Sequence, residues 1–237
     1  MTPSDPLFCF PPSPRISLAV TGQDARFPVR AIYCVGRNYR EHAREMGAPT
    51  DEAPCFFMKP AHALLADSSR IPYPPFTQDF QHEVELVVAL GSGGRRIAPQ
   101  EAVQAIFGYA IGLDLTRRDL QAQLKKRGQP WELSKSFTGS AACSALVPAG
   151  VGRFVDSPRT IRLVVNGTLR QEGRTDEMIW PIATLISELS RYEELAAGDL
   201  LFTGTPAGVG PLAAGDRGTA EVVGECHLDF EVVTGPA

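Results

Sequence analysis

The sequence lacks the features typical of disulfide-rich or zinc-binding proteins, of membrane-spanning proteins and of secreted proteins. Its five cysteines are scattered and never form a CxxC pair, which argues against a disulfide framework or structural zinc site and predicts a reducing compartment. No run of the sequence approaches the roughly 18 apolar residues of a membrane-spanning helix. Residues 1–15 are proline-rich and lack an apolar stretch preceded by basic residues, so no secretory signal is expected. These absences together predict a cytoplasmic protein.

Basic residues are also in the minority, with 23 Lys and Arg against 27 Asp and Glu and a formal net charge of −4. Neither nucleic acid nor an anionic membrane surface is therefore an expected partner. Hydrophobic residues at 43% and charged residues at 21% exclude a disordered chain. The 22 glycines and 20 prolines favour many short strands joined by tight turns over a helical bundle.

The chain divides into a proline-rich N-terminal arm, residues 1–28, and a single catalytic domain, residues 29–237. Apolar patterns predict strands at 16–20, 31–35, 82–90, 106–113, 161–165, 200–203, 221–223 and 226–233, and helices at 39–46, 99–105, 116–126 and 181–192. Asn38 and Glu41 have the spacing of a capping box, and Asn166-Gly167 is a strong hairpin signal. Residues 49–75 are expected to be an irregular loop with short extended pieces. The predicted fold class is α+β and mostly β.

Three carboxylates stand out against their apolar surroundings. Glu83 and Glu85 are two residues apart on a predicted strand and so share one of its faces, and Asp114 ends another apolar run. Each has an ordinary interpretation: the two glutamates suit an exposed strand face, and Asp114 suits a helix N-cap. Taken together, they form an oxygen-rich ligand set without cysteine, which suits Mg²⁺ or Mn²⁺ and suits zinc poorly.

Three further features could carry chemistry. His42 and Glu45 are three apart on a predicted helix, where a carboxylate can orient an imidazole as a general base, although such pairs also occur on solvated helix surfaces. Lys135 lies in a semi-apolar segment and is either a surface lysine or a cation that faces substrate. The glycine-rich turn 203–210, which contains Thr205, could bind an anion or could be a plain wide turn.

In this order, these segments resemble the fumarylacetoacetate hydrolase superfamily, and its fumarylpyruvate hydrolase and acylpyruvase members in particular. The resemblance rests on Gly36-Arg37-Asn38-Tyr39 with His42 and Glu45, His82-Glu83-Val84-Glu85, residues 112–121, 131–137, 166–171 and 198–210. It implies a mixed β-sandwich roll, usually in a homodimer, with one Mg²⁺ or Mn²⁺ on Glu83, Glu85 and Asp114. It further implies that His42 and Glu45 activate water and that Lys135, Arg118, Gln121 and Thr205 contact substrate.

The resemblance leads to one expected function and two alternatives. The expected function is hydrolysis of a C–C bond in a 2,4-dioxo acid, an acylpyruvate such as fumarylpyruvate, in the breakdown of aromatic compounds. An oxaloacetate decarboxylase, or a dioxo-acid decarboxylase or isomerase of the same superfamily, is the nearest alternative. The His42–Glu45 pair favours hydrolysis, because tautomerisation needs no base for water. A non-catalytic, metal-stabilised binding protein explains the carboxylates but not the base, the lysine and the glycine-rich turn beside them.

Overall fold

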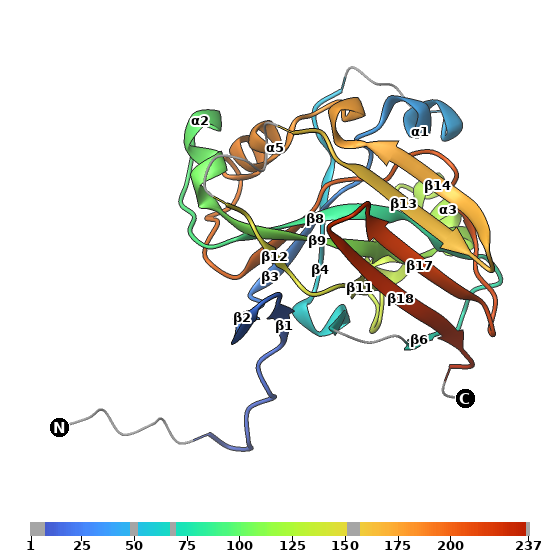
Figure 1. The fold of residues 1–237 in the computed structure, drawn as a ribbon. Coiled ribbons are helices and arrows are strands. Elements are labelled where there is room, and N and C mark those ends of the chain that lie inside the picture. Colours follow the sequence, from blue (N-terminus) through green and yellow to red (C-terminus); the bar gives the residue numbers. More distant parts are fainter. Residues whose placement is uncertain (1–7, 48–51, 67–69, 151–156, 236–237) are drawn as a thin grey trace.

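The computed structural model describes residues 8–47, 52–66, 70–150 and 157–235 of the chain. Strands dominate this part of the molecule, and short helices lie at its edges (Figure 1). The helices are α1 (Arg40–Glu45), α2 (Pro99–Ala102), α3 (Arg118–Lys126), α4 (Glu132–Lys135) and α5 (Ile182–Leu189), with 3-10 turns at Ala61–Ala63, Val103–Ala105 and Thr175–Glu177.

The strands are β1 (Ser17–Val20), β2 (Gln23–Pro28), β3 (Ala31–Val35), β4 (Phe56–Lys59), β5 (Leu64–Ala66), β6 (Arg70–Pro72), β7 (Phe80–His82), β8 (Val84–Leu90), β9 (Ile106–Asp114), β10 (Thr116–Arg117), β11 (Ala141–Cys143), β12 (Val147–Pro148), β13 (Thr160–Val165), β14 (Thr168–Arg174), β15 (Asp199–Phe202), β16 (Gly210–Pro211), β17 (Arg217–Val222) and β18 (Cys226–Val233). The predicted fold class, α+β and mostly β, is confirmed.

The strands form a large sheet, a smaller sheet that faces it, and two minor ones. The large sheet has the order β4-β3-β15-β8-β9-β11-β5, with β12 paired to β9, and the five-stranded sheet has the order β14-β13-β17-β18-β6. The large sheet contains both parallel and antiparallel strand pairs. β3 runs parallel to β15 and β5 parallel to β11, while β8 and β9 are antiparallel. A short sheet, β10-β7-β16, and the hairpin β1-β2 complete the set.

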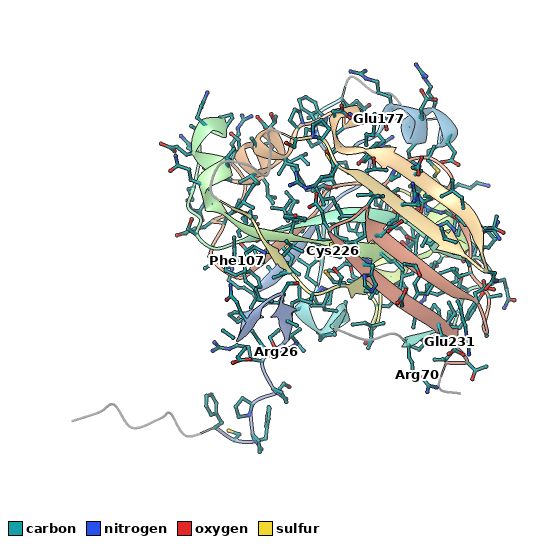
Figure 2. All side chains as sticks on the ribbon, in the orientation of Figure 1. Arg26, Arg70, Phe107, Glu177, Cys226 and Glu231 are labelled. Atoms are coloured by element: carbon teal, nitrogen blue, oxygen red, sulfur yellow. The ribbon has the colours of Figure 1, made fainter. Side chains whose placement is uncertain are left out.

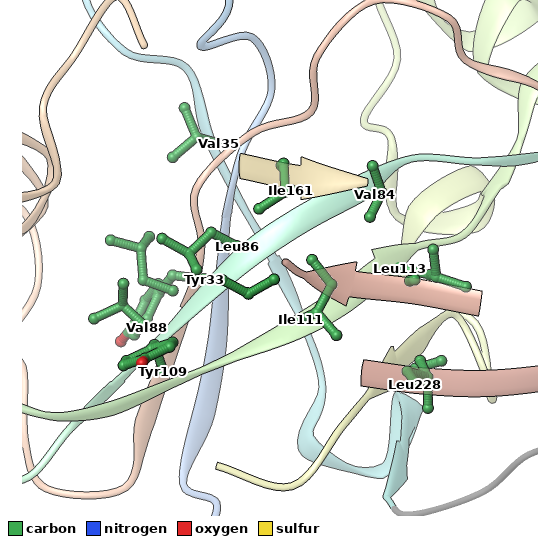
Figure 3. Packing of buried hydrophobic residues seen from close by; sticks show 14 of the residues in the cluster. Tyr33, Val35, Val84, Leu86, Val88, Tyr109, Ile111, Leu113, Ile161 and Leu228 are labelled. Atoms are coloured by element: carbon green, nitrogen blue, oxygen red, sulfur yellow. The ribbon is translucent and has the colours of Figure 1, made fainter. Parts of the chain in front are cut away.

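The main core lies between the two larger sheets. Leu86 and Ile111 of the large sheet belong to one buried cluster with Ile161 and Leu228 of the five-stranded sheet (Figure 3). A second buried cluster covers the other face of the large sheet, where Phe27 of the N-terminal hairpin packs. Successive side chains of a strand point to opposite faces, so the central strands must be apolar on both. All seven residues of β8 are accordingly buried.

The sequence predicted the central strands and four of the five helices of the described residues, but it missed α4 and about half of the strands and misplaced several boundaries. The strand expected at 82–90 is interrupted at Glu83, because β7 pairs with β10 and β16 while β8 enters the large sheet. The helix expected at 116–126 begins at Arg118, since residues 116–117 pair with β7 as β10. The helix expected at 181–192 spans only 182–189. The hairpin at Asn166-Gly167 is confirmed, and both residues have positive φ angles, 51° and 75°.

The capping box predicted at Asn38 and Glu41 is wrong. The residue that precedes α1 is Tyr39, with no capping side chain. Asn38 is buried and its amide instead donates hydrogen bonds to the carbonyls of Trp180 and Thr203, at 3.0 and 2.8 Å. These long-range bonds tie the start of α1 to the end of β15, and that link places the helix beside the glycine-rich turn.

Side chains project from the helices and strands over the outer surface (Figure 2). Arg26 marks the N-terminal hairpin, while Arg70 and Glu231 lie opposite each other where β6 pairs with β18 (Figure 2). Within the described ranges, no helix has the length and apolar character needed to cross a membrane.

Candidate active site

Three buried carboxylates converge at one end of the large sheet. Glu83 lies in the interruption between β7 and β8, Glu85 lies on β8, and Asp114 ends β9. The backbone N–H of Asp114 donates to the carbonyl of Glu83 at 2.8 Å, which holds the two strand ends together. One oxygen from each of the three side chains lies within 4.8 Å of the others, and all three residues are at most 5% exposed.

Alternation along the strands explains why two of these carboxylates share a face. Glu85 is followed at two-residue spacing by Val87, and Asp114 is preceded at that spacing by Gly112 and Ala110. Val87 and Ala110 both belong to the cluster beneath the large sheet, so Glu85 and Asp114 point to that side. Glu83, which lies outside the regular strand, completes the group.

Three buried or nearly buried cations surround the carboxylates. Lys135 Nζ lies 2.7 Å from Glu83 Oε2 and 2.7 Å from Asp114 Oδ2. Arg118 pairs with the second oxygen of Glu83. Lys59 Nζ lies 2.8 Å from Asp114 Oδ1 and also donates to the carbonyl of Lys135. The sequence motifs predicted Lys135 and Arg118 at this site, but nothing in the sequence indicated Lys59.

The pKa values in this cluster move in opposite directions. Burial opposes ionisation of Glu83, but Lys135 and Arg118 outweigh it and hold the pKa of Glu83 well below its usual range. Burial, together with the charges of Asp114 and Glu83, raises the pKa of Glu85 well above its usual range. Burial also opposes the charge of Lys135, yet Asp114 and Glu83 prevail and raise its pKa. Lys135 is therefore an ammonium at neutral pH.

The donor chemistry of the cluster fits a divalent cation. All the candidate ligand atoms are carboxylate oxygens, which hard ions such as Mg²⁺ and Mn²⁺ prefer. The mutual repulsion that raises the pKa of Glu85 is the repulsion that a cation between these groups relieves. Glu83, Glu85 and Asp114 are thus suited to hold such an ion.

His42 and Glu45 form the pair that their spacing on α1 predicted. His42 Nδ1 lies 3.0 Å from Glu45 Oε2, and the imidazole is only 3% exposed. The other oxygen of Glu45 accepts a hydrogen bond from the backbone N–H of Gly208 at 3.3 Å. Gly204 of the same turn donates its N–H to Glu85 Oε2 at 2.7 Å. The pair therefore lies beside the carboxylate cluster.

The glycine-rich turn 203–210 binds the protein's own carboxylates. Gly204 donates its N–H to Glu85 Oε2 at 2.7 Å, in the same turn whose Gly208 holds Glu45. Gly204 has a φ of 96°, and a Cβ there would lie 2.6 Å from the Cβ of Asn38, so glycine is required. The turn thus orients one candidate metal ligand and one member of the His–Glu pair.

Thr205 and Gln121 are buried within hydrogen-bond networks. The Thr205 hydroxyl donates to the carbonyl of Val84 at 2.8 Å and accepts from Gln171 Nε2 at 2.8 Å. Gln171 also accepts from His82 Nδ1 and from the N–H of Val84, and so connects β14 to the strand that carries the glutamates. Gln121 accepts a hydrogen bond from Arg118 at 2.8 Å. The sequence motif contained Gln171, but its connecting role depends on tertiary structure.

A curled β sandwich with a buried carboxylate triad suited to a divalent ion, and with a His–Glu pair bound by the same turn, defines a candidate metal-dependent enzyme. The chain belongs to the fumarylacetoacetate hydrolase family, because the family model for the C-terminal part of fumarylacetoacetate (FAA) hydrolase matches residues 31–233. The superfamily resemblance inferred from the sequence motifs is thereby confirmed.

Relatives within the family carry different names. The chain is similar to the fumarylpyruvate hydrolase of Pseudomonas aeruginosa, solved in complex with Mn²⁺ and pyruvate, with 44% identity, a TM-score of 0.92, and coverage of 96% of this chain and 100% of that one. It is also 42% identical over 203 residues to the mitochondrial oxaloacetate tautomerase of Homo sapiens, which covers 85% of this chain and 90% of the relative. The oxaloacetate tautomerase YcgM of Escherichia coli is 43% identical over 193 residues, 81% of this chain and 87% of that protein.

Proposed function

We propose that this protein is a metal-dependent hydrolase that cleaves a C–C bond in 2,4-dioxo acids, acylpyruvates such as fumarylpyruvate. The products are pyruvate and the carboxylic acid of the acyl half. The observation that carries this proposal is the buried His42 imidazole paired with Glu45, which is bound by the same turn that binds Glu85. Similarity to the fumarylpyruvate hydrolase of Pseudomonas aeruginosa supports it.

Glu83, Glu85 and Asp114 would hold one Mg²⁺ or Mn²⁺ ion, which when bound supplies Lewis-acid stabilisation of negative charge at the 2-oxo acid end of the substrate. In this proposal Arg118, Gln121 and Thr205 orient the substrate near the carboxylates. Arg118 is the best placed of these three residues to contact substrate, because its guanidinium already pairs with Glu83 and donates to Gln121.

His42 acts as the general base for water. The hydrogen bond between Nδ1 and Glu45 keeps a proton on Nδ1, so Nε2 is free to accept one. Removal of a proton from water by Nε2 allows the hydroxide to attack the C4 carbonyl of the substrate. The C3–C4 bond then breaks, the acyl half leaves as a carboxylic acid, and the electron pair remains on the pyruvate half as an enolate. Protonation of C3 completes pyruvate.

Lys135 stabilises the charge that develops on the enolate. Its ammonium is buried, and the raised pKa keeps it protonated at neutral pH. A fixed positive charge in a site removed from water is effective at such a point, because little reorganisation accompanies the reaction. Glu83 and Asp114 hold Nζ in position through two 2.7 Å contacts.

A second candidate is an oxaloacetate tautomerase, which the names of the curated relatives favour. Moving a proton at C3 of oxaloacetate passes through the same kind of enolate and consumes no water. The His42–Glu45 pair supports hydrolysis more directly, since only hydrolysis needs a base for water. The homodimer, the role in breakdown of aromatic compounds and the choice between Mg²⁺ and Mn²⁺ remain predictions.

An absorbance assay with a small panel of substrates tests the proposal. The protein, supplied with MgCl₂ or MnCl₂, is offered fumarylpyruvate, maleylpyruvate, acetylpyruvate and oxaloacetate, with and without EDTA. We expect loss of the enolised dioxo acid with pyruvate and the acyl acid formed in equal amounts, and no reaction with EDTA. Interconversion of the two oxaloacetate tautomers, with every acylpyruvate left intact, would reject hydrolysis and support the second candidate. If no substrate is turned over, both enzymatic functions are rejected and a metal-stabilised binding protein is the remaining interpretation.

A further inference from the structure

One face of α3 carries a stripe of polar side chains that begins at the carboxylate cluster. Arg118, Gln121 and Lys125 follow the i, i+3, i+7 spacing and therefore share a helix face. Arg118 contacts Glu83, and Gln121 contacts Arg118. With a rise of 1.5 Å per residue, the Cα atoms of Arg118 and Lys125 are about 10 Å apart along the helix axis. Lys125 is thus the residue of this polar stripe that lies farthest from the carboxylate cluster.

Aromatic rings fix the position of Lys125. Its Nζ lies 4.9 Å from the ring centroid of Trp131, whose ring is 6.0 Å from that of Phe57. Phe57 in turn lies 5.3 Å from the Nζ of Lys135. A wall of two aromatic rings therefore runs from the buried lysine of the site to the exposed lysine at its outer end.

Lys125 lies close to other cations, of which Arg118 and Lys135 already pair with Glu83. Partial burial and the neighbouring cations Arg118, Lys135 and Arg37 lower the pKa of Lys125, and they outweigh the opposing effect of Glu83. Within the described residues, no carboxylate pairs with Lys125, and Arg37 has only a loose contact with Glu52 at 3.8 Å. A negatively charged group of a ligand would relieve this repulsion.

We propose that Lys125 binds a second, distal carboxylate of the substrate and makes the site selective for dicarboxylic acylpyruvates. This inference rests on the proposed function. An extended chain gains about 3.8 Å for every three bonds, so the two carboxyl carbons of a seven-carbon dioxo diacid are about 7.6 Å apart. The spacing between Arg118 and Lys125 accommodates that length, with the side chains closing the remaining distance. The aromatic wall contacts the unsaturated middle of such a chain.

Kinetics with two substrates test the inference in the metal-loaded protein. The ratio of kcat/KM for fumarylpyruvate to that for acetylpyruvate, which lacks the distal carboxylate, is measured for wild type, Lys125→Met, Lys125→Arg and Lys126→Met. We expect Lys125→Met to lower this ratio about 10-fold, as loss of a charged hydrogen bond does, and Lys125→Arg to restore most of it. Lys126, exposed and rotated by about 100° on the same helix, is the matched control and should leave the ratio unchanged. An unchanged ratio in Lys125→Met, or an equal fall in Lys126→Met, overturns the inference.

Equilibrium binding separates this inference from the proposed function. Calorimetry on the Mn²⁺-loaded protein compares 2-oxopimelate, a seven-carbon diacid without the cleavable dioxo unit, with 2-oxoheptanoate, its monoacid counterpart. We expect wild type to prefer the diacid about 10-fold and Lys125→Met to lose that preference. If wild type cleaves no acylpyruvate but shows this Lys125-dependent preference, the proposed function fails and the distal subsite stands. If acylpyruvates are cleaved but wild type binds both acids equally, the distal subsite fails and the proposed function stands.

Discussion

Lys59 Nζ lies 2.8 Å from Asp114 Oδ1, and both side chains are almost completely excluded from solvent. Lys59 ends β4, at the edge of the large sheet, and lies opposite Ile32 in the pairing of β3 with β4. Because directly opposite residues share a face, Lys59 points to the side of the sheet on which Ile32 packs and Asp114 lies. Its second contact, with the carbonyl of Lys135, fixes the backbone of that lysine.

Replacing Lys59 with Met should destabilise the protein by about 3 kcal/mol, because a buried charge then loses one of its partners. Urea unfolding of the metal-free protein measures this directly. Lys126→Met, at an exposed position, should change the free energy of unfolding by less than about 0.5 kcal/mol. A similar small change for Lys59→Met would show that Lys135 alone satisfies Asp114.

Replacing His42 with Ala should lower kcat by roughly 10²–10⁴, the usual contribution of a general base. The measurement is the initial rate of acylpyruvate cleavage at saturating substrate and metal. His227→Ala, at an exposed histidine far along the chain on β18, is the control and should retain the wild-type rate. Near-normal cleavage by the His42 variant would remove this residue from the mechanism.

Glu83→Gln should weaken divalent metal binding by at least about 10-fold and slow the reaction, since one charged ligand oxygen becomes a neutral amide. Titration of Mn²⁺ into the protein, followed by calorimetry, gives the dissociation constant without reference to activity. Glu101→Gln on the exposed surface of α2 serves as the matched change. Metal binding as tight as in wild type would exclude Glu83 as a ligand.

Asp119 should make the start of α3 sensitive to acid. Burial opposes its ionisation, but hydrogen bonds from the N–H of Gln78, the hydroxyl of Thr77 and the N–H of Leu120 outweigh that effect and lower its pKa. A carboxyl whose pKa is lower in the folded state stabilises the fold above its ordinary pKa of 3.8, and this stabilisation is lost as pH falls through the folded value.

The corresponding variant is Asp119→Asn. It should be less stable than wild type at pH 7, and the difference should shrink as pH falls from about 5 to about 3. Thermal unfolding across this range measures both proteins, with exposed Asp24→Asn as the control. A difference that stays constant with pH would show that the Asp119 charge contributes nothing to stability.

The parts of the fold that the sequence predicted are those with a strong local signal. Residues 106–113 are almost continuously apolar because β9 is covered on both faces, and such a run is typical of a central strand. The apolar stripe of α5 and the turn at Asn166-Gly167 carry equally local information. The carboxylates could be grouped because charged residues are unusual in such apolar surroundings.

What the sequence did not indicate depends on contacts between distant segments. Lys59 lies in a proline-rich segment that predicted only irregular structure, and its partner Asp114 is 55 positions further along the chain. Asn38 matched a local capping pattern, but carbonyls on two distant segments bind its amide. The interruption at Glu83 likewise arises because β7 and β8 enter different sheets. The local sequence does not indicate which sheet a strand joins.

When Glu85 is ionised as a metal ligand, the three carboxylates and the three cations around them cancel in formal charge. A divalent ion placed among them leaves an excess of two positive charges, and a doubly charged organic acid removes that excess. Binding of the ion should therefore increase the affinity for the acid, and binding of the acid should increase the affinity for the ion. Thermodynamic reciprocity requires the same factor in both directions. On the proposed function, the ion and the diacid are therefore expected to bind cooperatively.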